Sequence, residues 1–125
     1  PALSTPDASP PAPLPTFPSL LFQGSSVTPQ PEADGLLDQV AAALAERPGA
    51  RVTLTGHTDN GRTAALRETL SLARAEVVSR EFTDRGVAPE RITTAGRADA
   101  EPVGDNRTRE GRAQNRRVDI RIEEG

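Results

Sequence analysis

The sequence predicts an α/β fold: a two-layer sandwich of order βαβαβ(α)β, with a mixed four-stranded sheet and helices mainly on one face. Segments with apolar residues at helical spacing alternate along the chain with short segments of period two, which is typical of α/β layers. The clearest strand segments, residues 51–57 and 117–123, each have one apolar and one polar face. We therefore expect helices to cover mainly one side of the sheet.

The chain divides by composition into a predicted tether, residues 1–18, and a predicted domain, residues 19–125. Seven of the first eighteen residues are proline. Because proline fixes φ and lacks a backbone donor, this stretch favours an extended, solvated tether. The remaining residues suffice for one small domain. We expect a membrane anchor or partner domain upstream of the tether.

The first half of the domain contains a strand and a helix. Residues 19–23 are short and apolar, as expected of a strand. Residues 28–32 combine a hydroxyl, prolines and an acid, which are signals for the start of a helix. Apolar residues then recur at helical spacing, and Arg-Pro-Gly at 47–49 ends the helix. These apolar residues are Leu36, Leu37, Val40, Ala41 and Leu44.

The middle of the chain alternates over residues 51–57, which predicts a half-buried strand. Residues 59–61 favour a turn, and a long helix is predicted from about 63 to 84. Its apolar stripe is expected to comprise Leu66, Leu70, Ala73 and Val77, with Val78 and Phe82 beside it. Gly86 follows where a left-handed helix cap is expected.

The last part of the domain predicts two further strands. A weaker one covers residues 91–96. Residues 101–111 form a polar connection that has room for a helical turn. The final strand has the clearest alternation in the chain, with Val118, Ile120 and Ile122 on its apolar side.

Composition excludes several classes of function. The net charge is −3 and only three residues are aromatic, which disfavours nucleic-acid binding because phosphate attraction and base stacking need basic and aromatic surfaces. Acids interrupt the C-terminal arginine cluster, so we interpret it as a mixed, solvated surface. There is no cysteine, which excludes thiol chemistry and disulfides. No apolar run reaches the roughly 18 residues of a membrane span.

Asp59 and Arg74 are the most informative candidate binding residues. Asp59 ends a predicted strand, and Arg74 follows fifteen residues later on the next predicted helix. Together they can hold the ammonium and carboxylate of a zwitterionic ligand, since a guanidinium binds a carboxylate bidentately. Three alternatives stay open: Asp59 caps the helix, Arg74 extends its head into water, or the two side chains pair with each other.

His57 lies two residues before Asp59 and is the only histidine. A metal site or a Ser–His–acid triad would have to use it, but the sequence offers neither a second histidine nor a serine in a nucleophile-elbow context. We interpret His57 as a solvated residue at the strand end. We expect no metal, no cofactor and no catalysis.

The residues then show a resemblance to a known family. Five motifs occur in order: Gly56-His57-Thr58-Asp59; Leu70-Ser71-x-x-Arg74-Ala75; Gly86-Val87-x-x-x-Arg91-Ile92; then Gly96, Pro102 and Asn106; and Glu110 to Ile120, which contains Asn115-Arg116-Arg117-Val118-Asp119. From about residue 20 to residue 123 the chain resembles the OmpA-like (OmpA/MotB C-terminal) peptidoglycan-binding domain.

The resemblance implies a ligand and a place for this domain. In that family the acid at the position of Asp59 takes the ammonium, and the arginine at the position of Arg74 the carboxylate, of diaminopimelate in the peptidoglycan stem peptide. Thr58, Asn115 and Arg116 would be neighbours in the groove. The implied function is non-catalytic wall binding in the cell envelope, in the periplasm or at the outer membrane, with membrane contact only through an upstream anchor.

Three positions depart from the family pattern. Arg62 replaces a usual glycine, Arg67 replaces a usual asparagine, and residues 23–25 lack a common acid. The added cations can strengthen carboxylate capture, repel the ligand ammonium or reshape the loop, so Arg67 is a further candidate site residue. The alternatives are an OmpA-like fold used as a protein-interaction module with weakened or lost wall binding, and a wall hydrolase that uses His57.

Overall fold

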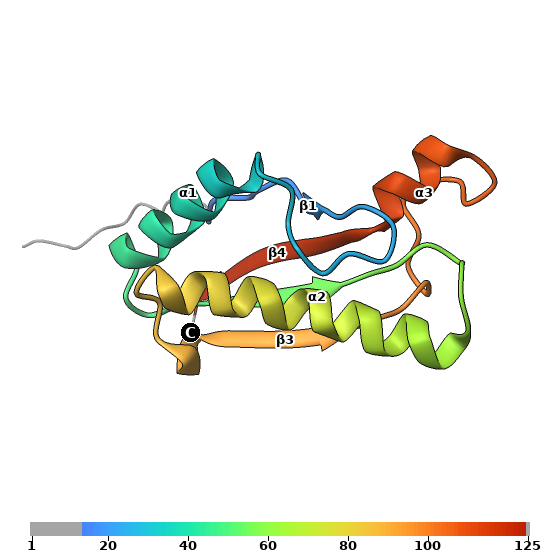
Figure 1. The fold of residues 1–125 in the computed structure, drawn as a ribbon. Coiled ribbons are helices and arrows are strands. Elements are labelled where there is room, and N and C mark those ends of the chain that lie inside the picture. The colour runs from blue at the N-terminus through green and yellow to red at the C-terminus, as the bar shows by residue number, and fades with distance from the viewer. Residues whose placement is uncertain (1–13, 125) are drawn as a thin grey trace, which may run out of the picture.

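The computed structural model describes residues 14–124, and its four strands form one sheet with the order β1-β4-β2-β3. Three α-helices and a 3₁₀ turn at Pro89–Arg91 connect them (Figure 1). The elements are β1 (Leu20–Leu21), α1 (Ala33–Glu46), β2 (Ala50–Gly56), α2 (Ala64–Asp84), β3 (Ile92–Gly96), α3 (Arg109–Asn115) and β4 (Arg117–Glu124).

The sheet is mixed, as predicted. Strands β2 and β3 are parallel, with Leu54 opposite Thr94. Strand β4 lies between β1 and β2 and is antiparallel to both, with Ile120 opposite Leu54. A parallel pair needs a crossover connection, and α2 provides it. The predicted fold class is confirmed.

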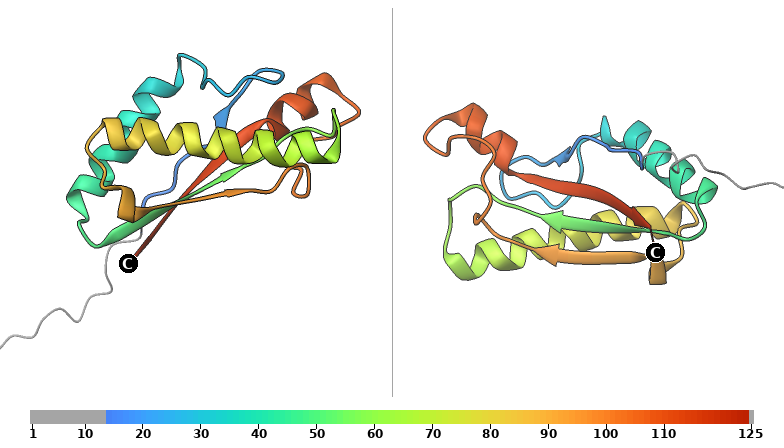
Figure 2. Two further views of the ribbon diagram at one scale, coloured as in Figure 1. Left: turned by 60° about the horizontal axis from the view of Figure 1, so that its bottom comes forward. Right: turned by 180° about the vertical axis from the view of Figure 1, so that it is seen from behind.

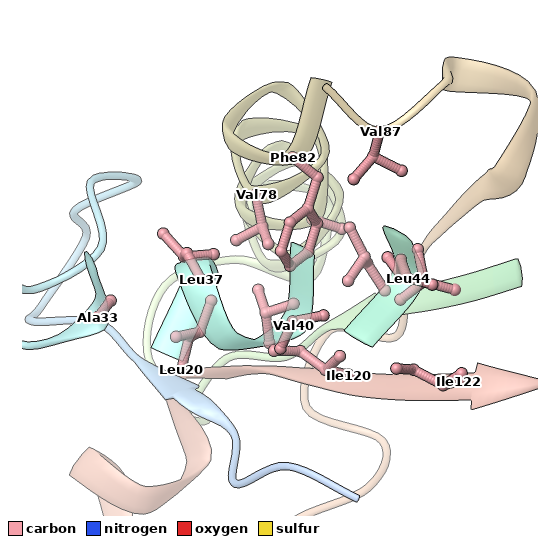
Figure 3. Packing of buried hydrophobic residues seen from close by; sticks show 14 of the residues in the cluster. Leu20, Ala33, Leu37, Val40, Leu44, Val78, Phe82, Val87, Ile120 and Ile122 are labelled. Carbon is pink, nitrogen blue, oxygen red and sulfur yellow. The ribbon is translucent and has the colours of Figure 1, made fainter. Parts of the chain in front are cut away.

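Helices α1 and α2 cover one face of the sheet, and within residues 14–124 no helix covers the other face (Figure 2). The buried apolar side chains of β2 and β4 form one cluster with those of α1 and α2. Figure 3 shows Val40 of α1 and Phe82 of α2 packed over the sheet, with Ile120 of β4 below them. All three side chains are buried. Aliphatic residues and two phenylalanines therefore fill the core.

Helix α2 begins after Thr63, whose side chain accepts a hydrogen bond from the Leu66 backbone N–H. Its predicted apolar stripe was wrong at the start of the helix, because Leu66 is 53% exposed, whereas the predicted neighbours Val78 and Phe82 are buried. The buried face instead contains Ser71, Arg74, Ala75, Val78 and Phe82. Two polar side chains therefore occupy the half of α2 that lies nearest the strand ends.

Two glycines let α2 approach the strands closely. A Cβ atom on Gly56 would lie 1.8 Å from the Ser71 carbonyl oxygen, and one on Gly96 would lie 2.7 Å from the Leu72 nitrogen. The Ser71 hydroxyl, brought close in this way, accepts a hydrogen bond from the Ala98 N–H. The Gly and Leu-Ser positions of the motifs therefore set the distance between helix and sheet.

The sheet topology gathers four chain segments at one end. Strands β1, β2 and β3 all finish there, and β4 starts there. The Phe22 N–H donates to the Arg116 carbonyl, and the His57 N–H to the Arg117 carbonyl. Residues that follow β1 and β2 consequently lie next to residues that precede β4.

The connection before β4 differs from the prediction in one respect. A polar connection with room for a helical turn was expected over residues 101–111, but α3 extends from Arg109 to Asn115. The last strand begins at Arg117, as predicted. Thr108 caps α3 by accepting from the Gly111 N–H. Helix α3 has no apolar stripe that could have revealed its length.

The predicted tether meets the domain earlier than its composition suggests. Leu14 and Phe17 are partly buried against the core, although both fall inside the predicted tether 1–18. Residues 1–13 of that tether lie outside the described residues. Within residues 14–124, no helix has the length and apolar character needed to cross a membrane.

Gly56→Ala should destabilise the fold strongly, because the new methyl group would collide with the backbone of α2. We expect the free energy of unfolding to fall by about 2 kcal/mol or more, as in overpacked cores. Urea denaturation measures this change. Gly35→Ala on α1 is the matched control: its Cβ meets open space, so it should be neutral or stabilising. Equal stability of the two variants would contradict the proposed close approach.

Candidate functional site

A pocket of about 290 Å³ lies at the end of the sheet where the four segments meet. We call it the Asp59–Arg74 pocket. It is lined by Gly24, Thr58, Asp59, Asn60, Gly61, Arg62, Arg67, Leu70, Arg74 and Arg112. One carboxylate and four guanidinium groups therefore surround a space of a size that suits a small polar ligand group.

Arg74 is fully buried and does not reach into water as a surface arginine would. Its Nε donates to the Ser26 carbonyl at 2.9 Å, and its Nη2 to the Gly24 carbonyl at 2.7 Å. Its Nη1 donates to the His57 carbonyl at 3.1 Å. The guanidinium therefore ties the segment after β1 to the end of β2.

Arg74 makes no ion pair among the described residues, yet it keeps its positive charge. Burial lowers the pKa of Arg74 to about 10, the charge of Arg116 adds to this, and the charge of Asp59 opposes it. The side chain therefore stays protonated at neutral pH. Its Cζ lies 5.2 Å from the centroid of the Phe22 ring, a favourable cation–π distance.

Three of the five N–H donors of Arg74 are used by carbonyls. Within residues 14–124, one N–H on Nη1 and one on Nη2 have no further protein acceptor. Because Arg74 also lines the pocket, these two donors can offer an incoming carboxylate a two-point contact.

Asp59 pairs with Arg116 and not with Arg74. Arg116 Nη1 lies 3.0 Å from Asp59 Oδ2, and the Gly61 N–H donates to Asp59 Oδ1 at 2.9 Å. Burial raises the pKa of Asp59, but these hydrogen bonds and the charges of Arg116 and Arg74 outweigh it, so the pKa lies below its usual value. The carboxylate is ionised at neutral pH and retains lone pairs for a cation.

The two arginines that depart from the family pattern have different partners. Arg67 Nη1 donates to the carbonyls of residues 60, 61 and 62, and its Nε lies 3.1 Å from Asp99 Oδ1. Arg67 therefore holds the loop that carries Asp59. Arg62 hydrogen-bonds the Ser25 hydroxyl across the pocket. Its backbone has φ +70, the left-handed conformation that glycine adopts readily.

The remaining predicted site residues divide into two groups. Thr58 lines the pocket, with its hydroxyl bonded to the Asp59 carbonyl. Asn115 is fully buried and outside the pocket lining. Its amide oxygen accepts from Val103 and Gly104, and its amide nitrogen donates to Gly104 and Asn106. Asn115 therefore shapes the loop before α3 and does not face the pocket.

The interpretation of His57 as a solvated residue was wrong. Its side chain is 1% exposed, with Nε2 3.1 Å from Asp119 Oδ2. The segment after β3 crosses this end of the sheet, because the Thr58 N–H donates to Ala98 and Arg117 Nη2 to Glu101. Asp119 also accepts from Arg117 Nε and Ser19 Oγ.

The interpretation of the C-terminal arginines as a solvated surface holds only in part. Arg117 is buried and binds Asp119. Arg112 was not singled out as a site residue, yet it lines the pocket from α3. Across residues 14–124 no group of three or more His, Cys, Asp or Glu side chains is placed to hold a metal ion.

A sequence model of the OmpA family matches residues 21–116. The chain belongs to the OmpA family. Among curated relatives of this OmpA-family chain, the peptidoglycan-binding protein ArfA of Mycobacterium tuberculosis is 44% identical over 85 residues, which cover 68% of the chain and 26% of ArfA. The probable lipoprotein YiaD of Escherichia coli is 38% identical over 104 residues, which cover 83% of the chain and 48% of YiaD. The chain thus spans less than half the length of these relatives.

Solved structures give the same family. The peptidoglycan-associated lipoprotein from Burkholderia pseudomallei superposes with a TM-score of 0.81 at 28% identity, covering 84% of this chain and 89% of that one. The cell wall anchor of the T6SS from Pseudomonas aeruginosa has a TM-score of 0.69 at 38% identity, covering 84% of this chain and 75% of that one. The sheet and helices are therefore those of an OmpA-like domain.

Asp119→Asn should destabilise the domain, because it leaves buried Arg117 without its counter-charge. The Asp119 carboxylate is partly exposed, so we expect a loss of about 1–2 kcal/mol at neutral pH, less than for a fully buried pair. Urea unfolding measures the loss. Glu76→Gln, on the exposed side of α2, should have no effect and serves as the control.

The effect of Asp119→Asn should also depend on pH. Burial raises the pKa of Asp119, but hydrogen bonds from His57, Arg117 and Ser19 hold it well below its usual value. The contribution of Asp119 to the free energy of unfolding is therefore complete above the unfolded pKa of about 3.9, and it is lost as pH falls below that value. The stability gap between wild type and variant should shrink below about pH 4. A constant gap from neutral to acidic pH would contradict the assigned contacts.

Proposed function

We propose that this domain binds peptidoglycan through the diaminopimelate of the stem peptide, without catalysing a reaction on it. The observation that carries the proposal is the Asp59–Arg74 pocket, in which one ionised carboxylate and one buried guanidinium with spare donors line the same space. A free diaminopimelate side chain ends in an ammonium and a carboxylate. The two protein groups match its two charges.

Each pole of the ligand has a defined role in this proposal. Asp59 accepts from the ligand ammonium while it keeps its contacts to Gly61 and Arg116. Arg74 donates its two remaining terminal N–H groups to the ligand carboxylate. Arg67, Thr58 and Arg116 position these groups through the loop and the ion pair. Asn115 contributes through the loop before α3.

The wider role follows from the relatives. ArfA is named for peptidoglycan binding, and the Pseudomonas structure is named a cell wall anchor. We propose that this domain fixes a cell-envelope protein to the wall, with residues 1–18 as a tether to a membrane anchor upstream. A weak single-site affinity suits this role, because a tethered module faces a polymer with many copies of its ligand.

Asp59→Asn should weaken binding of a diaminopimelate-containing muropeptide by about tenfold, since it removes one charge-assisted hydrogen bond and keeps the shape of the side chain. Isothermal titration calorimetry measures this loss. Asp105→Asn is the matched control, because Asp105 pairs with Arg107 outside the pocket. Binding that is equal in Asp59→Asn and wild type would contradict the ammonium contact.

Arg74→Lys should weaken binding of the same muropeptide by at least tenfold, because the lysine ammonium cannot reproduce the planar pair of donors that arginine presents. Thermal unfolding of this variant is needed beside the titration, since Arg74 also holds three carbonyls. A folded Arg74→Lys variant with unchanged affinity would remove Arg74 from the ligand site.

A protein-interaction module is the second candidate function, and the observation that favours it is the excess of positive charge in the pocket. A pull-down with purified sacculi separates the two. Retention of wild type and loss of Asp59→Asn supports wall binding. Wild type that is not retained supports the interaction module.

A further inference from the structure

The Asp59–Arg74 pocket carries more positive charge than a diaminopimelate side chain requires. Its lining has one carboxylate, Asp59, and that carboxylate is already paired with Arg116. Arg67 is paired with Asp99. In the described part of the chain, the other three lining arginines make no ion pair: Arg62, Arg74 and Arg112.

These three guanidinium groups differ in what they can still bind. Arg74 is buried and faces the first ligand carboxylate in the proposed function. Arg62 is exposed and uses Nη2 for the Ser25 hydroxyl. Arg112 is half-buried and uses Nη1 for the Asn106 carbonyl. Arg62 and Arg112 therefore keep donors for a second anion at the rim of the pocket.

The backbone of Arg62 adds an independent observation. A left-handed φ of +70 is unfavourable for a residue with a Cβ, and the chain holds arginine there nonetheless. The neighbouring Gly61, which would tolerate this conformation without strain, lies one position earlier. Strain at a ligand-facing position is typical of functional residues. Because glycine would suit this backbone better, we attribute the arginine at position 62 to its guanidinium group.

We infer that the Asp59–Arg74 pocket binds a stem peptide with two free carboxylates, the second held by Arg62 and Arg112. This inference rests on the proposed function and narrows its ligand. Besides the diaminopimelate side chain, the stem peptide offers the α-carboxylate of its γ-linked glutamyl residue and the carboxylate at its C-terminus. Amidation of either removes one negative charge and leaves the zwitterionic end unchanged. The domain therefore discriminates free-acid stem peptides from amidated ones.

The experiment is a calorimetric titration of the full chain with three synthetic tripeptides of alanine, γ-linked glutamate and diaminopimelate. One has both extra carboxylates free, one is amidated at the glutamyl α-carboxylate, and one is amidated at the C-terminus. One amidation should weaken binding by about two- to fivefold, the range of partly exposed ion pairs. The amide that has this effect identifies the second anion. The discrimination should shrink as salt is added.

Two variants test the assigned residues. Arg62→Gly relieves the backbone strain and removes the exposed side chain with its guanidinium, so its thermal midpoint should be unchanged or higher while discrimination between free acid and amide disappears. Arg112→Gln should lose discrimination in the same way. Arg109→Gln is the matched control: Arg109 is exposed at the start of the same helix and outside the pocket lining, so discrimination should persist.

The outcomes distinguish failure of the second-anion site from failure of the proposed function. Wild type that binds all three peptides equally overturns the second-anion site and leaves diaminopimelate binding intact. Discrimination that survives in both Arg62→Gly and Arg112→Gln overturns the residue assignment. A free-acid peptide that does not bind wild type at all overturns the proposed function, and the second-anion site with it.

Discussion

The buried guanidinium of Arg74 is the interaction on which this end of the molecule depends. A charge removed from water is costly unless hydrogen bonds and nearby charges replace its hydration. Here three carbonyl groups and the face of Phe22 surround it. These carbonyls come from the segments after β1 and β2, so satisfying one side chain fixes the relative position of two loops. These two segments, helix α2 and Arg112 of α3 line the pocket.

The second constraint is that some arginines near the pocket bind protein groups while others keep donors for a ligand. Arg116 neutralises Asp59 and donates to the Phe22 carbonyl, so it joins the loop after β2 to the end of β1. Arg67 crosses the loop after β2 and binds three of its carbonyls. Neither has much left for a ligand, because each is occupied by protein. The arginines whose donors bind protein groups therefore keep the pocket ordered. The remaining lining arginines keep donors available for a ligand.

Much of the fold could be predicted from the sequence, because alternation over residues 51–57 and 117–123 depends on a sheet with one buried face. Helix α2 was predicted within one residue, but only the C-terminal part of its buried face, Val78 and Phe82, was predicted. Ser71 and Arg74 are polar, and hydropathy places such residues outside. The pairing of Asp59 with Arg116 joins residues 57 positions apart, which no local pattern reveals. His57 was misplaced for the same reason: its neighbour Asp119 lies on β4, far along the chain.

The proposed tether and the low single-site affinity expected of the pocket complement each other. A single ammonium–carboxylate contact in a partly wet groove contributes little affinity, because water competes for every donor. A tether raises the local concentration of wall ligands and compensates for that weakness. In the proposed function, a second charged contact would change selectivity more than retention, since many weak sites would hold the module near the polymer. In our proposal, Arg62 in its left-handed conformation gives up a little folding stability in exchange for a second contact to the stem peptide.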